Sequence, residues 1–301
     1  MVLELLIGPK KAEKKPWDMF FIGMLYSSVA MFLSVWIFRE QASIIMVLLT
    51  VIACLPLVHR TFLREEKADV ALDTERKRLK EHWRAIQFLM LLFLGFVVSF
   101  SLWYVFLPDE MVQTSFNSQI QTIQSINAKV AASQAVTGRN IISSQNTLSS
   151  SSISLDGLFF KILLNNIKVL LFSIFFAFFY GAGAIFILTW NASVISAAVG
   201  NFVRNNIGDY AAQFGLIKAG GYFHIFSLGL LRYFIHGIPE ILAYFVGGLA
   251  GGIVSFAVIR HDFGTERFKA ILFDAFDLVL ISVFILVVAG LLEVYVTPAF
   301  F

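Results

Sequence analysis

Apolar runs of about 20 residues recur along the chain, and this pattern restricts its fold more than any other feature. A transmembrane helix needs about 20 mostly apolar residues to cross a bilayer. The clearest runs cover residues 17–38, 42–58, 86–107, 160–187, 241–259 and 270–295. Strands of a membrane β-barrel would alternate polar and apolar residues instead, whereas these runs are continuous. The sequence predicts an all-α fold, a polytopic transmembrane helix bundle.

Composition supports the same reading. The chain has 301 residues, of which 58% are hydrophobic and 14% are charged, against about 25% charged residues in soluble domains. The net charge of +3 is small and its basic residues cluster beside the apolar runs. We therefore expect a lipid bilayer, and no nucleic acid, as the partner. The single Cys54 excludes an internal disulfide and a thiolate metal site.

Charge divides the chain into four regions. Residues 1–16 hold four lysines and predict an interfacial segment, and residues 17–107 predict transmembrane helices joined by a charged cytoplasmic helix at 60–84. Residues 108–158 are polar and poor in Lys and Arg, which indicates an external loop or helix. Residues 159–301 predict a transmembrane core. We expect a multi-pass protein of the plasma membrane with a cytoplasmic N-terminus.

The number of spans depends on two segments. Residues 192–203 are apolar but short, so we expect an amphipathic or re-entrant segment, with a full span as the alternative. Residues 222–259 form either two passes or one re-entrant hairpin. The sequence favours about seven apolar helices, and counts of five or six are the alternatives.

One motif concentrates ionisable groups inside an apolar run. Arg232, His236 and Glu240 are spaced four residues apart and would share a face of one helix. Gly237 and Pro239 lie between the last two, and proline favours the first position of a helix. This predicts a broken helix or re-entrant hairpin, with one half-helix ending near His236. Broken helices at membrane depth are typical of transporter binding sites.

Ionisable groups at membrane depth need partners, and they usually mark a functional site. The alternative is a paired cluster that only locks helices together. Candidate members of the polar intramembrane cluster, besides His236, Gly237, Pro239 and Glu240, are Arg232, Asn165, Asn166, Lys168, Asn191, Asp274 and Asp277.

Small residues indicate where helices approach closely. Glycines spaced three or four residues apart allow helix backbones to approach. The predicted packing glycines are Gly181, Gly183, Gly247, Gly248, Gly251 and Gly252. Such faces serve contacts within the chain or between copies, so self-association stays open.

Signatures of catalysis are weak. An intramembrane metalloprotease could use His236 and Glu240 as two ligands, but the His-Glu-x-x-His signature is absent and catalytic zinc needs three protein ligands. The sequence contains neither a Gly-x-Ser-x-Gly elbow nor a phosphate-binding Gly-rich loop followed by Lys and Ser or Thr. We expect no enzymatic activity, no metal and no cofactor.

Three motifs occur in a familiar order. These are Asn165-Asn166, then Gly181-Ala-Gly-x-x-x-x-Leu-x-x-Asn191, then His236-Gly-Ile-Pro-Glu240 before a helix of small residues. Together they resemble the stage II sporulation protein M family, in a variant similar to archaeal members, over residues 159–296. The family usually has Asn-Gly where this chain has Asn191-Ala192.

The resemblance carries an expectation about function. Members in spore-forming bacteria hold peptidoglycan-degrading enzymes together in the septal membrane and are not the hydrolases themselves. It therefore implies a non-enzymatic membrane scaffold or assembly factor with membrane or envelope proteins as partners, and it does not imply sporulation for this chain. The alternative function is a transporter or lipid-handling protein with a polar intramembrane site at His236 and Glu240.

Overall fold

The computed structural model describes residues 17–71, 75–125, 155–177, 182–214, 219–259 and 264–297. Within these residues the secondary structure is helical and contains no strand. Seven of the described helices contain a segment long and apolar enough to cross a membrane. The predicted all-α transmembrane bundle is confirmed. The predicted interfacial segment at 1–16 and most of the predicted external loop lie outside the described residues.

The N-terminal helices form a tightly packed group. It consists of α3 (Trp17–Ile37), the short 3-10 turn η1 (Arg39–Gln41), α4 (Ala42–Ala71) and α5 (Glu75–Phe106). Helices α3 and α5 touch backbone to backbone, because a Cβ atom at Gly95 would overlap the carbonyl oxygen of Phe20. Nearby, Ser28 Oγ lies 2.9 Å from Ser99 Oγ. This polar contact lies inside the apolar packing of the two helices.

The segment predicted as a cytoplasmic helix at 60–84 belongs to two elements. Helix α4 continues past its span to Ala71, and α5 begins at Glu75, before its own span starts at His82. Both spans therefore continue as helix beyond their apolar parts, which places the charged residues of 62–71 and 75–81 on helical extensions.

The polar segment after α5 begins with structure that packs on the bundle. Helix α6 (Asp109–Ser115) is followed by helical residues 117–125. Gln119 is fully buried and its Nε2 donates to Ser193 Oγ at 3.0 Å. Arg204 donates to the carbonyl oxygens of Tyr104 and Leu107, at 3.1 and 3.2 Å. Ser193 and Arg204 both belong to α9 (Ala182–Phe214), so these bonds hold the end of α5 and the helical residues 117–125 against α9.

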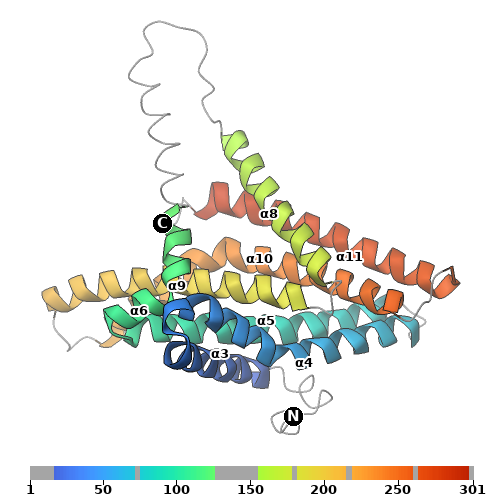
Figure 1. Ribbon diagram of the computed structural model, residues 1–301. Helices are drawn as coiled ribbons and strands as arrows, with labels where there is room; N and C mark the ends of the chain where they lie inside the picture. Colours follow the sequence, from blue (N-terminus) through green and yellow to red (C-terminus); the bar gives the residue numbers. More distant parts are fainter. Residues whose placement is uncertain are drawn as a thin grey trace, which may run out of the picture.

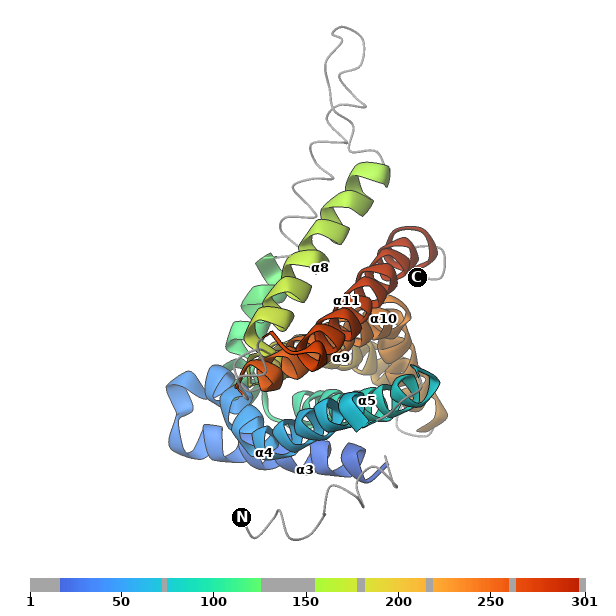
Figure 2. The ribbon, with the colours of Figure 1, turned by 90° about the vertical axis from the view of Figure 1, so that its right-hand side faces the viewer.

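The described C-terminal half consists of four helices and a final turn. They are α8 (Leu155–Ala177), α9 (Ala182–Phe214), α10 (Ala219–Ile259), α11 (Glu266–Leu291) and the π-helical turn η2 (Leu292–Val296). Helix α10 lies in the middle of the bundle and its span is the most buried of the seven, whereas the span of α8 is the least buried. In both ribbon views α8 crosses the other helices obliquely, and its N-terminal part projects away from them (Figures 1 and 2).

The two segments whose number of membrane passes the sequence left open both lie within continuous helices. Residues 192–203 lie within α9, whose span covers Ile185–Asn206, so they do not form a re-entrant segment. Helix α10 runs from Ala219 to Ile259 with Pro239 inside it, in place of the broken helix or hairpin that the sequence favoured. Proline is tolerated inside membrane helices because neighbouring helices stabilise the bent segment. The motif from His236 to Glu240 therefore lies on one helix.

Candidate functional site

Helices α8 and α10 meet through a polar contact at the motif. Asn166 Nδ2 donates a short hydrogen bond to Glu240 Oε1. Asn166 is buried at 6% exposure, whereas its neighbour Asn165 is exposed, because successive residues on a helix point about 100° apart. Only one of the two predicted asparagines therefore reaches the motif.

The carboxyl group of Glu240 also interacts with a second carboxyl group. Glu293, in the π-turn η2, lies within hydrogen-bonding reach of Glu240. Tyr244, one turn further along α10 and 3% exposed, is close enough to interact electrostatically with both. Isolated π-turns are rare and occur often at functional sites. A carboxyl pair of this kind can hold one proton between its oxygens.

His236 connects α10 to the end of the last span. Its Nδ1 lies 3.2 Å from Thr297 Oγ1, and Thr297 Oγ1 donates to the carbonyl oxygen of Leu292 at 3.1 Å. A threonine hydroxyl has a single proton to donate. The Thr297 oxygen must then accept from His236, so the proton of a neutral His236 lies on Nδ1.

These contacts tie three helices together at one level of the bundle. We use the name "polar cluster" for Asn166, His236, Glu240, Tyr244, Glu293 and Thr297. Each member comes from α8, α10 or the end of the last span. Because polar groups in hydrocarbon are costly without partners, these mutual contacts lower the cost of their burial.

Other residues predicted for this cluster lie elsewhere. Asp274 and Asp277 are on α11, 19 and 16 residues before Glu293, which is about 24–28 Å at 1.5 Å per residue. Lys168 is exposed on α8. The backbone of Arg232 lies in α10, one turn before His236, while its side chain lies outside the described part of the structure.

The predicted packing glycines bring α10 against α8. A Cβ atom on Gly251 would overlap the carbonyl oxygen of Ile174, and one on Gly247 would overlap the end of the Leu170 side chain. Gly248 and Gly252 are also buried. Gly183 lies in α9, and Gly181 is outside the described residues. Close packing of α8 on α10 positions Asn166 next to Glu240.

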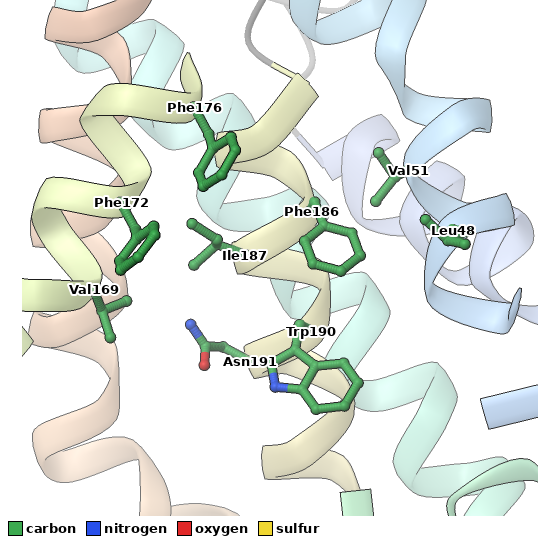
Figure 3. A pocket seen from close by; sticks show the side chains of 9 residues that line it. All are labelled: Leu48, Val51, Val169, Phe172, Phe176, Phe186, Ile187, Trp190 and Asn191. Atoms are coloured by element: carbon green, nitrogen blue, oxygen red, sulfur yellow. The ribbon is translucent and has the colours of Figure 1, made fainter. Parts of the chain in front are cut away.

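Asn191 belongs to a separate cavity. The cavity has a volume of about 700 Å³ and is lined by residues of α4, α8 and α9. Figure 3 shows the rings of Phe172 and Phe176 from α8 and of Phe186 and Trp190 from α9 around this space, with Asn191 among them. The cavity is therefore mainly apolar and aromatic, with one amide at its wall.

Sequence reasoning did not select Glu293, Tyr244 or Thr297. Glu293 could have been found by comparing how deep each carboxyl group lies within its span. Glu240 lies five residues after the start of the span Ile235–Ile259, and Glu293 lies three residues before the end of the span Phe268–Val296. Successive spans run in opposite directions, so both residues lie near the same membrane boundary.

Among the residues that the structure describes, no group of three His, Cys, Asp or Glu side chains could hold a metal ion. The site as described consists of one histidine, two carboxyl groups, an amide and two hydroxyl groups. Such a set can bind protons, hold helices together or line a polar path.

Comparison with known proteins gives one result. A family model described as Stage II sporulation protein M matches residues 85–298. No curated protein and no solved structure matches the chain. The match begins at the third span, earlier than the resemblance seen from residue 159, so α5 and the segment after it are part of the shared region. Because the match covers well over half of the chain, this multi-pass membrane protein belongs to the stage II sporulation protein M family.

Proposed function

We propose that the protein is a non-enzymatic scaffold in the plasma membrane, with its N-terminus in the cytoplasm. The observation that carries this proposal is the mutual pairing of the motif's side chains. Asn166 bonds to Glu240, and His236 bonds to Thr297. Side chains that bond to one another between helices hold those helices at fixed positions. A scaffold needs such a rigid membrane core.

Docking surfaces outside the hydrocarbon are available for partners. Helix α4 continues ten residues past Thr61, where its span ends, to Ala71, and α5 starts seven residues before His82. At 1.5 Å per residue these extensions are about 10–15 Å long. The basic residues of this region favour the cytoplasmic side. We propose that membrane or envelope proteins bind to these extensions.

The test uses adjacent asparagines on α8. Native membranes with wild-type protein are cross-linked, solubilised and separated by native electrophoresis. Wild type is expected in an assembly well above the chain's 33.8 kDa. Asn166→Ala should weaken the assembly and the thermal stability of the protein together, because Glu240 loses its donor. Asn165→Ala is the matched control and should change neither, because Asn165 is exposed. A wild-type chain that migrates at its own mass would contradict the scaffold.

The second candidate is a transporter, and the carboxyl pair favours it. Glu240 and Glu293 interact near one membrane boundary, and such pairs can relay protons. Glu240→Gln keeps the side-chain shape and its acceptor oxygen for Asn166 but cannot release a proton. Proton flux is measured in proteoliposomes with an entrapped pH-sensitive dye. A folded Glu240→Gln protein that loses flux supports transport, whereas wild-type vesicles that leak no faster than empty ones exclude proton transport.

A further inference from the structure

The outer face of α8 carries polar groups where lipid would surround it. Lys161, Asn165 and Lys168 are all exposed and lie in the span Gly157–Ala177. They are spaced four and three residues apart, so they form one stripe on the helix. Among the described residues, no acidic side chain pairs with either lysine. Cations inside the hydrocarbon are costly, so this stripe needs a polar or anionic neighbour.

The stripe continues into the aromatic cavity. Val169 and Phe172, which line the cavity, lie one turn after Asn165 and Lys168 respectively. The cavity's other walls come from α4 and α9, for example Val51 and Trp190 (Figure 3). A cationic edge and an apolar cavity thus share one side of α8. Such a surface matches a molecule with an anionic head and an apolar chain.

We propose that this surface binds an anionic phospholipid, with its headgroup at Lys161 and Lys168 and an acyl chain in the cavity. The dimensions agree with one lipid. Lys168 lies eight residues before Phe176, about 12 Å along the helix at 1.5 Å per residue. Half of the hydrocarbon core is about 15 Å thick, and α8 runs obliquely (Figures 1 and 2). An acyl chain of one leaflet can therefore extend from Lys168 through the cavity to Phe176.

The volume also suits an acyl chain. The cavity of about 700 Å³ lies within the usual range for small-molecule sites, roughly 300–1,000 Å³. An acyl chain has no hydrogen-bonding groups, so it can pack against these aromatic walls without leaving a polar group unpaired. Asn191 is the one side-chain amide at the wall, and it can bond to the ester region of a lipid. This inference concerns a surface outside the polar cluster and stands apart from the proposed scaffold.

Trp190 provides the reporter for the test. Full-length protein is reconstituted in phosphatidylcholine vesicles that contain increasing fractions of chain-brominated phosphatidylglycerol or chain-brominated phosphatidylcholine. Bromine quenches tryptophan on contact, and subtracting the signal of Trp190→Phe isolates the contribution of Trp190. Half-maximal quenching of Trp190 should need roughly 25-fold less brominated phosphatidylglycerol than brominated phosphatidylcholine, because each of the two lysines contributes roughly five-fold.

Two variants connect this preference to the lysines. The double variant Lys161→Gln, Lys168→Gln should be quenched equally by both lipids. Lys269→Gln is the control and should keep the wild-type preference, because Lys269 pairs with Glu266 at the start of α11, away from the stripe. Native mass spectrometry of the wild type, counting retained phosphatidylglycerol against phosphatidylcholine, gives an independent measure that needs no substitution.

Three outcomes would overturn the proposal. The first is that quenching curves of the wild type coincide for the two lipids. The second is that the double-lysine variant retains the preference of the wild type. The third is that neither lipid quenches Trp190 while the remaining tryptophans respond, which would mean that a protein helix fills the cavity instead of lipid.

Discussion

Replacement of Gly251 by alanine tests the packing that positions the polar cluster. Gly251 lies in α10, and a Cβ atom there would overlap the carbonyl oxygen of Ile174 and approach the Ala177 Cβ to 3.2 Å. The obstacle is the backbone of α8, which cannot rotate away as a side chain can. Helix α8 must therefore shift outward from α10, which would pull Asn166 away from Glu240.

Gly237 supplies the matched control in the same helix. A Cβ atom at Gly237 would meet nothing within 4 Å. Both substitutions gain the same helix propensity, up to about 1 kcal/mol. Their difference therefore isolates the overpacking penalty, typically about 1–3 kcal/mol. Gly247→Ala should fall between them, because it meets the end of the Leu170 side chain, which can move.

The assay is unfolding in mixed micelles, with SDS as denaturant and circular dichroism as the readout. We expect Gly251→Ala to unfold more easily than Gly237→Ala by about 1–3 kcal/mol. Free energies of unfolding that agree within about 0.5 kcal/mol for the two variants would refute the close contact of α8 and α10. So would a larger loss at Gly237 than at Gly251.

Three further predictions concern other parts of the bundle. Arg204→Met should lower the free energy of unfolding by about 1–3 kcal/mol, because the carbonyl oxygens of Tyr104 and Leu107 lose their donor; a melting temperature equal to that of wild type would contradict this. Thr265→Val should cost about 1 kcal/mol in the same unfolding assay, since its hydroxyl caps α11, and Thr265→Ser should restore most of the loss. Cys54 is fully buried, so a maleimide should label it only after denaturation; rapid labelling of native protein would place it at a surface.

The sequence predicted the spans well because hydrocarbon imposes a length and an apolarity that are visible without any tertiary information. The runs at 86–107 and 270–295 correspond to the spans His82–Phe106 and Phe268–Val296. Boundaries were less accurate where helices continue into water. Glu, Lys and Arg have helix propensities close to those of Leu and Met, so a helical end rich in them, such as that of α4, carries no hydropathy signal.

At the motif the sequence predicted a break, whereas the structure has one helix with Pro239 inside it. Gly237 and Pro239 lower helix propensity locally, but packing decides whether a helix continues. From Ala243 through Ile253 every residue of α10 is buried, and the helix is held by its neighbours on several sides. At the motif itself, hydrogen bonds of His236 to Thr297 and of Glu240 to Asn166 hold the helix on either side of Gly237 and Pro239.

The polar cluster was predictable in part. Asn166, His236 and Glu240 were selected because polar groups are conspicuous in apolar runs. Glu293 was not selected, whereas Asp274 and Asp277 were, because the depths of the carboxylates along their spans were not compared. Which of Asn165 and Asn166 faces Glu240 depends on the rotation of α8, which its contacts with Gly247 and Gly251 determine.

The length of α10 has a mechanical consequence. Its 41 residues make a rod of about 60 Å, twice the roughly 30 Å of the hydrocarbon core. Proline removes one backbone hydrogen bond, so the rod is least stiff at Pro239. Bending of α10 would therefore concentrate at Pro239, next to the hydrogen bond between Asn166 and Glu240.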